Sequence, residues 1–231
     1  MNNLNFISPE IFISLSIMFL LIFGVFKKNS SNIIHYLSIV CLLITGILII
    51  NNPSGNQVTL FSGSFIIDNL SSFMKILTIL GGASILLMSK KFLKISKIFL
   101  IEYPILILSS ILGMLVMISS NDLMVFYIGL ELQSLALYVL ASFNRDQLKS
   151  SESGLKYFVL SALSSGLLLY GCSLIYGFSG STNFDIISNT VNSNHYGLTF
   201  GIVFILVGLS FKISAVPFHM WAPDVYEGSP T

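Results

Sequence analysis

Residues 122–141 read DLMVFYIGLELQSLALYVLA, and this stretch decides the fold class of the chain. It is long and apolar enough to cross a bilayer as a helix, which takes about 20 residues. Its one interior charge is Glu131, and a charge near the bilayer centre costs about 3 kcal/mol or more. Tyr127, Ser134 and Tyr138 share a helical face with Glu131. This polar stripe predicts that the face is turned toward protein or water rather than lipid.

The composition of the whole chain agrees with this interpretation. It is 54% hydrophobic and 9% charged, whereas soluble domains carry about 25% charged residues. The net charge of +1 gives no reason to expect a nucleic-acid partner. Cys41 and Cys172 lie far apart and outside any ligand spacing, so neither a metal site nor a disulfide framework is predicted. The chain is therefore expected to be an all-α integral membrane protein.

Other apolar stretches predict about seven transmembrane helices in all. The expected spans are 9–26, 33–50, 70–88, 101–119, 122–141, 152–176 and 198–214. Ser8 is expected to cap the first of them, and Asn121 or Ser120 the fifth. The seventh is expected to be broken near Pro217, since proline cannot continue the hydrogen bonding of a helix.

The cations of the loops predict the orientation of the chain. Basic residues occur between spans one and two, three and four, and five and six, whereas the loops 51–69, 120–121 and 177–197 contain no Lys or Arg. By the positive-inside rule the basic loops are expected on the inner side of the membrane and the N-terminus on the outer side. The loop 51–69 is expected to form a small hairpin around Ser62 and Gly63, and 177–197 a surface coil.

Three of the eleven basic residues lie inside long apolar stretches, namely Lys75, Lys156 and Lys212. Lys212 precedes the expected helix break, where freed backbone groups can hold water or ions. Lys156 has Glu152 at i−4, so an ordinary pair on the helix surface is the alternative to a functional site. Lys75 is expected to extend to the outer surface. For Glu131 the alternatives are a structural ion pair or a carboxylate that carries protons.

Two motifs then identify a family. GLELQSLALYVL at 129–140 and GLSFKISAVPFHMWAPDVYEGSPT at 208–231, supported by GLKYF at 154–158, resemble NADH dehydrogenase subunit 2. This family is the smallest antiporter-like membrane subunit of respiratory complex I, and only its N-terminal half is matched. The resemblance implies part of an inverted-repeat fold, with three helices in 1–100 and a first, truncated repeat in 101–231.

The resemblance also implies a function, namely proton translocation coupled to electron transfer from NADH to ubiquinone. The family's proton-pathway residues match Glu131, Lys156 and Lys212, with His219, Tyr127, Ser134 and Tyr138 as possible supporting residues. The chain is expected to be a subunit of an enzyme without a redox centre, metal or cofactor of its own. NADH, FMN, iron–sulfur clusters and ubiquinone belong to the complex as a whole.

Partners and location follow from the same resemblance. Other membrane-arm subunits, membrane lipids and a separate chain with the second half of the subunit are the expected partners. The mitochondrial inner membrane is expected, with a bacterial plasma membrane as the alternative. Two other functions stay open, namely a subunit of a multisubunit cation/proton antiporter and a structural half needed only for assembly.

Overall fold

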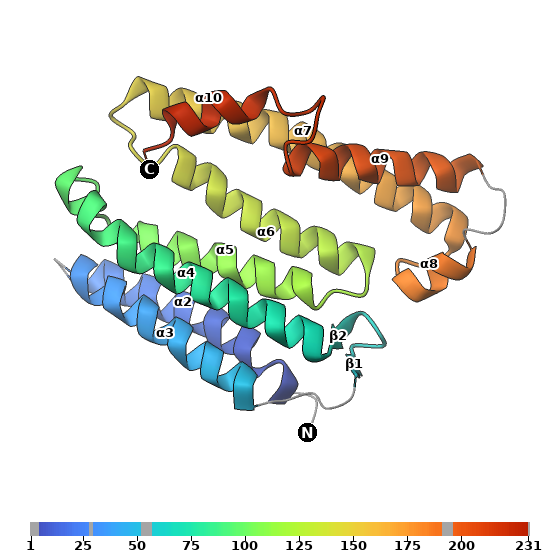
Figure 1. The fold of residues 1–231 in the computed structure, drawn as a ribbon, viewed down its shortest axis with the longest axis horizontal. Coiled ribbons are helices and arrows are strands. Elements are labelled where there is room, and N and C mark those ends of the chain that lie inside the picture. Colours follow the sequence, from blue (N-terminus) through green and yellow to red (C-terminus); the bar gives the residue numbers. More distant parts are fainter. Residues whose placement is uncertain (1–4, 28–29, 52–56, 191–195, 231) are drawn as a thin grey trace. The chain divides into compact units, whose positions relative to one another are not determined.

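The fold is almost entirely helical in the computed structural model, which describes residues 5–27, 30–51, 57–190 and 196–230 (Figure 1). In chain order its elements are α2 (Ser8–Phe26), α3 (Ser31–Asn51), β1 (Val58–Leu60), β2 (Phe65–Ile67), α4 (Asn69–Ile95), α5 (Glu102–Ile118), α6 (Leu123–Ala141), α7 (Leu148–Ser179), α8 (Phe184–Thr190), α9 (Tyr196–Lys212) and α10 (Trp221–Gly228).

Each predicted span is confirmed as a helix. Five of the described helices, α2, α3, α4, α6 and α7, are long and apolar enough to cross a membrane. The apolar helices α5 and α9 have 17 residues each. The number of crossings therefore stays a prediction. Both α4 and α7 are longer than predicted. The extension of α4 contains three lysines, which favour helix but lower the hydropathy on which the prediction relied.

The chain divides into two compact units, which we describe separately. The first comprises Met1–Ser120 and Ile128–Leu137, and the second Asn121–Tyr127 and Tyr138–Thr231. This division follows spatial contacts rather than internal repeats. The predicted repeat boundary at residue 100 therefore stays a prediction.

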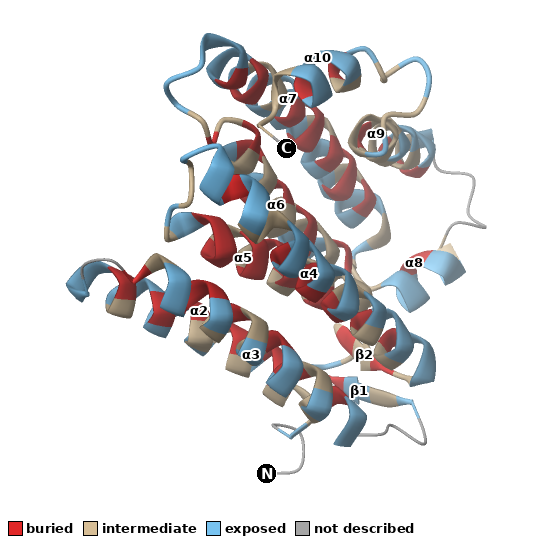
Figure 2. Cartoon of the chain, turned by 60° about the vertical axis from the view of Figure 1, so that its left-hand side comes forward, coloured by how far each residue is buried: buried red, intermediate tan, exposed pale blue. Residues whose placement is uncertain are grey.

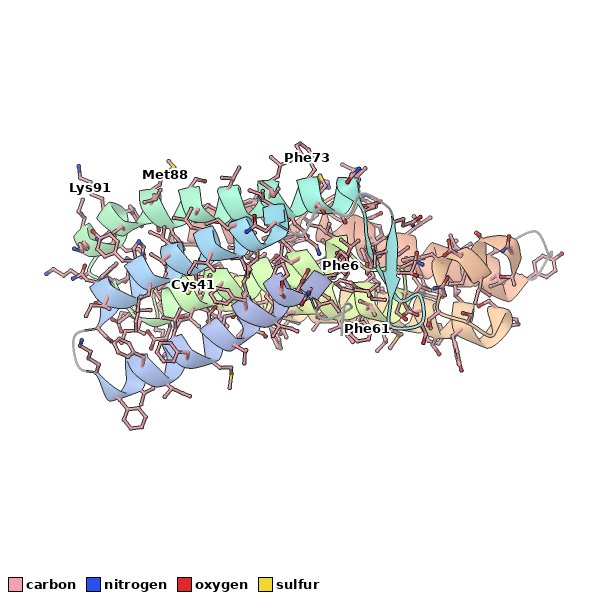
Figure 3. The ribbon with its side chains drawn as sticks, turned by 90° about the horizontal axis from the view of Figure 1, so that it is seen from below. Phe6, Cys41, Phe61, Phe73, Met88 and Lys91 are labelled. Atoms are coloured by element: carbon pink, nitrogen blue, oxygen red, sulfur yellow. The ribbon has the colours of Figure 1, made fainter. Side chains whose placement is uncertain are left out.

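In the first unit α2, α3, α4 and α5 pack against one another as a four-helix bundle (Figure 1). Figure 2 shows that the helices carry buried and exposed faces. The buried faces hold Ile13, Leu42 and Leu86, which are fully buried. Exposed apolar residues cover the other faces, and Figure 3 shows Phe73 and Met88 pointing away from α4. Apolar side chains on both faces are typical of helices that meet protein on one side and lipid on the other.

Basic residues gather at one end of the first unit. The ammonium of Lys90, near the end of α4, lies 3.6 Å from the centre of the Tyr36 ring, near the start of α3. Lys94 lies 5.4 Å from the ring centre of Phe99. Lys27 follows the end of α2, directly before α3 begins. The predicted common side for these cations is thus confirmed within this unit.

The predicted hairpin is also confirmed. β1 and β2 pair antiparallel, with Val58 opposite Ile67 and Leu60 opposite Phe65. The turn between them has positive φ at Phe61, Ser62 and Gly63. The amide of Ile66 donates to the carbonyl of Ser119, 2.8 Å away, which fixes the hairpin to the end of α5.

Three local predictions are wrong. Ile7, not Ser8, is the N-cap of α2, and the Ser8 hydroxyl instead donates to the carbonyl of Asn5. Asp122 caps α6 by accepting the amide of Met124 at 2.8 Å. The segment 177–197 is not all coil, because α7 continues to Ser179 and α8 follows it. Bonds to the α6 cap, such as Thr182 Oγ1 to Asp122, stabilise this region and could not be seen in its Gly- and Ser-rich composition.

Candidate functional site

Lys75 is buried rather than extended to the surface, so that prediction is wrong. Its side chain is 3% exposed, and its ammonium lies 2.5 Å from the carboxylate of Glu10, which is 6% exposed. The ring of Phe65 lies 5.4 Å from the same ammonium. Glu10 sits in the first turn of α2, where the sequence suggested only a favourable helix-end charge. The sequence did contain a signal for this pair, because Glu10 and Lys75 lie at a similar depth in two of the predicted spans.

Glu131 lies on α6, whose backbone makes an unusually close approach to α5 in the first unit. A Cβ atom on Gly113 would lie 2.5 Å from the Gln133 amide, and one on Gly129 would lie 2.8 Å from the Met117 amide. Only glycine allows this spacing, so the two glycines fix the helix that carries Glu131.

The polar stripe on α6 is turned inward, as predicted. Ser134 and Tyr138 are each 5% exposed, and Tyr127 and Glu131 are half-buried. The Ser134 hydroxyl donates to the backbone carbonyl of Glu131 at 3.2 Å. Glu131 belongs to the first unit and Lys156 to the second, so their action as a pair stays a prediction.

Lys156 carries two ion pairs within the second unit. Its ammonium lies 2.8 Å from Glu152, one turn earlier on α7, and 2.9 Å from Asp224 on α10. The pair with Glu152 was the expected alternative and is confirmed. The pair with Asp224 was not predicted, although Asp224 stands in the motif that identified the family. The Lys156 side chain is 42% exposed and lines a polar cavity of about 150 Å³.

Lys212 is the last residue of α9, and its ammonium donates to the hydroxyl of Tyr138 at 2.8 Å. The sequence placed both residues in the site but not in contact, since 74 positions separate them. Helix α9 ends five residues before Pro217, and α10 begins at Trp221. That α9 and α10 are the halves of one broken membrane helix stays a prediction.

Aromatic side chains hold the segment after Lys212. The Trp221 ring stacks on Tyr157 at 4.7 Å and on Phe211 at 5.5 Å between ring centres. The Trp221 indole nitrogen also donates to the Phe211 carbonyl at 3.2 Å. His219 lies in the same segment, and its Nδ1 is buried without a hydrogen-bond partner among the described residues. A supporting role for His219 stays a prediction.

Small residues set the spacing of α7 and α9. A Cβ atom on Gly171 would lie 2.8 Å from the Gly201 carbonyl, and the Ser164 hydroxyl donates to the Gly208 carbonyl at 3.0 Å. These small residues thus allow the two helices to pack closely. This packing fixes α9 relative to α7, and Lys212 is the last residue of α9.

Comparison with known proteins now decides the family. A family described as NADH:quinone oxidoreductase/Mrp antiporter, TM, matches residues 120–231. NADH-quinone oxidoreductase subunit N of Pelagibacter ubique is 81% identical over 231 residues, which are 100% of this chain and 49% of that protein. The chain belongs to the subunit N family. The Bartonella bacilliformis member is 54% identical over 97% of this chain and 46% of its own length.

The match is to the N-terminal half of the family, so the chain spans about half the length of the curated relatives it matches. The resemblance inferred from the two motifs is confirmed. These relatives are bacterial, so the predicted mitochondrial location finds no support among them. The alternative, a bacterial plasma membrane, fits, and several helices suited to crossing it are present.

Solved structures confirm the antiporter-like fold. A chain of respiratory complex I from Thermus thermophilus matches with a TM-score of 0.79 and 26% identity, over 96% of this chain and 47% of that one. A chain of the Mrp complex from Dietzia sp. matches with a TM-score of 0.75 over 96% of this chain and 43% of that one. At 20% identity, the second match supports the fold alone.

Proposed function

We propose that the chain is the N-terminal half of a membrane-arm subunit of proton-translocating NADH–quinone oxidoreductase in a bacterial plasma membrane. The observation that carries this proposal is 81% identity to a subunit N over every residue of the chain. The subunit contributes charges to proton movement, and electron transfer takes place in other subunits, which hold the flavin, the iron–sulfur clusters and the quinone site. Other membrane-arm subunits and lipid are its neighbours.

We assign the central proton-carrying role to Lys212. A hydroxyl partner such as Tyr138 can orient the ammonium without neutralising it, whereas a carboxylate would hold the proton in place. In the mechanism we propose, the charges on Glu131 and Lys156 govern when Lys212 takes up and releases its proton. The remaining half of the fold, as found in the full-length relatives, completes the path.

The test is a comparison of two lysine variants in the complete complex, in native membrane vesicles. Lys212→Ala should lower NADH-driven proton uptake by about tenfold or more, because proton transfer through a positioned group is lost. The matched control is Lys149→Ala, since Lys149 is 77% exposed and pairs only at the surface with Glu227. It should pump at close to the parental rate.

Acidification of the vesicles is measured with a fluorescent dye, and assembly by NADH–ferricyanide activity on a native gel. Parental pumping by an assembled Lys212→Ala complex would refute the proton-carrying role.

The second candidate function is a subunit of a cation/proton antiporter, favoured by the family description, which also names the Mrp antiporter. Sodium-dependent transport in vesicles that lack the NADH dehydrogenase partners would support it. Transport strictly dependent on NADH oxidation would exclude it.

A further inference from the structure

Helix α10 contacts the first part of α7 from its start to its end. Asp224 pairs with Lys156 at 2.9 Å, and Glu227 pairs with Lys149 at 3.1 Å. At the end of α10 the two backbones are so close that a Cβ atom on Gly228 would lie 2.7 Å from the Lys149 carbonyl. Any shift of this short helix would therefore change the ion pair between Asp224 and Lys156.

The same helix is also connected to Lys212 by two routes. Through the backbone, Trp221 donates its indole N–H to the carbonyl of Phe211, which directly precedes Lys212. Through side chains, Trp221 stacks on Tyr157, and the Tyr157 ring meets Tyr138 edge-on at 4.7 Å. Tyr138 in turn accepts a hydrogen bond from the Lys212 ammonium. The two lysines thus lie at opposite ends of one continuous set of contacts.

The core of this connection is buried, whereas the segment before α10 carries exposed side chains. Trp221 and Val225 are 8% and 5% exposed and pack with Ala141 at the end of α6. Between α9 and α10, Val216 and Met220 are 80% and 78% exposed. The buried cluster therefore joins α10 to the end of α6.

We propose that Asp224 is a positioning residue that couples the charge on Lys156 to the placement of Lys212. This inference rests on the function proposed above. While Lys156 is charged, its pair with Asp224 holds α10 against α7, and the Trp221 contacts hold Lys212 on Tyr138. When the Lys156 ammonium is drawn away from Asp224, the pair weakens and α10 is released. The backbone and the ring contacts then move the end of α9, and Lys212 leaves its present partner.

Glu152 provides the discriminating comparison. It contacts the same ammonium at nearly the same distance as Asp224, 2.8 Å against 2.9 Å. However, Glu152 lies on α7 itself, so its pair with Lys156 joins α7 only to itself. A purely electrostatic role of the acids would make both matter equally. A mechanical role through α10 requires Asp224, whereas the Lys149–Glu227 pair, whose side chains are 77% and 75% exposed, contributes little to holding α10.

The experiment measures four variants in the complete complex in native vesicles: Asp224→Asn, Asp224→Glu, Glu152→Gln and Glu227→Gln. Proton uptake per NADH oxidised, kcat and the KM for ubiquinone are determined for each, with assembly checked on a native gel. Asp224→Asn should lower proton uptake and kcat by about three- to tenfold, with KM unchanged. Asp224→Glu should restore at least half of the parental rate, and the Glu152 and Glu227 variants should resemble the parent.

Equal losses in Asp224→Asn and Glu152→Gln would overturn the coupling through α10, as would parental pumping by Asp224→Asn. If Asp224→Asn does not assemble, Trp221→Phe decides, because it keeps an aromatic ring but removes the N–H donated to Phe211. It should show the same loss, and parental pumping would overturn the proposal. Lys212→Ala, measured in parallel, distinguishes a failure of the proposed function from a failure of the coupling. If that variant pumps normally, the proposed function fails, whereas normal pumping by Asp224→Asn alone refutes only the coupling.

Discussion

Lys75 in the first unit and Lys212 in the second are both lysines in apolar helices, yet their surroundings differ in the feature that matters for proton transfer. Lys75 is sealed in a regular helix against the carboxylate of Glu10. Lys212 ends a helix, is half-buried and meets a hydroxyl. A sealed ion pair stabilises both charges and resists change, whereas a lysine beside a non-helical segment can change partners. Burial of a charge alone therefore does not identify a proton carrier.

The largest effect is expected when the ion pair of Lys75 is broken. Glu10→Ala leaves a buried ammonium without its counter-charge, which costs about 3–5 kcal/mol. We expect strongly reduced assembly of the complex, measured as its amount in membranes on native gels.

The double variant Glu10→Leu with Lys75→Met removes both charges and should restore assembly with normal proton pumping. If the double variant assembles but does not pump, Lys75 carries protons after all, and the contrast with Lys212 disappears.

The next effect concerns Glu131, which we propose as a functional charge like Lys212. Glu131→Gln keeps the size of the side chain and its capacity for hydrogen bonds but removes the charge. Proton uptake should fall by about tenfold, because a group that exchanges protons is replaced by one that cannot. Initial rates of vesicle acidification, normalised to assembled complex, provide the measurement. Unchanged rates would instead favour a structural subunit that serves assembly.

The smallest effect sharpens the description of Lys212. Tyr138→Phe removes the hydroxyl that Lys212 contacts but keeps the ring that packs against Tyr157. Loss of one hydrogen bond should slow pumping by about two- to tenfold. Tyr170→Phe, on an exposed part of α7, is the control and should have no effect. An assembled Tyr138→Phe complex that pumps at the control rate would show that the hydroxyl does not orient Lys212.

Most of the helices could be predicted because the signal for a membrane helix is local. Length and hydropathy located all of the predicted spans, and two short β-prone runs on either side of Ser62 and Gly63 located the hairpin. The failures occurred where polar sequence folds through distant contacts. Helix α8 forms in a Gly- and Ser-rich segment that is bonded to the cap of α6. Composition could not predict bonds between segments 60 positions apart.

The candidate site, too, could be predicted only in part. Glu131, Lys156 and Lys212 were found from sequence, because a charge in an apolar span is conspicuous and because two motifs matched a family. Partners on other helices were not found: Asp224 lies 68 positions from Lys156, and Glu10 lies 65 positions from Lys75. No periodicity along one helix can predict which side chain of another helix will reach it.

The sequence by itself therefore determined the membrane class, the helices and the residues whose charge is costly, since each depends on the transfer of a local segment from water to lipid. Only the tertiary structure decided what each charge contacts. Lys75 forms a buried ion pair with Glu10, Lys156 pairs with Asp224 of α10, and Lys212 donates a hydrogen bond to Tyr138. Those pairings depend on close packing at glycines and on ring stacking, which bring distant segments together and which act only once the helices have assembled.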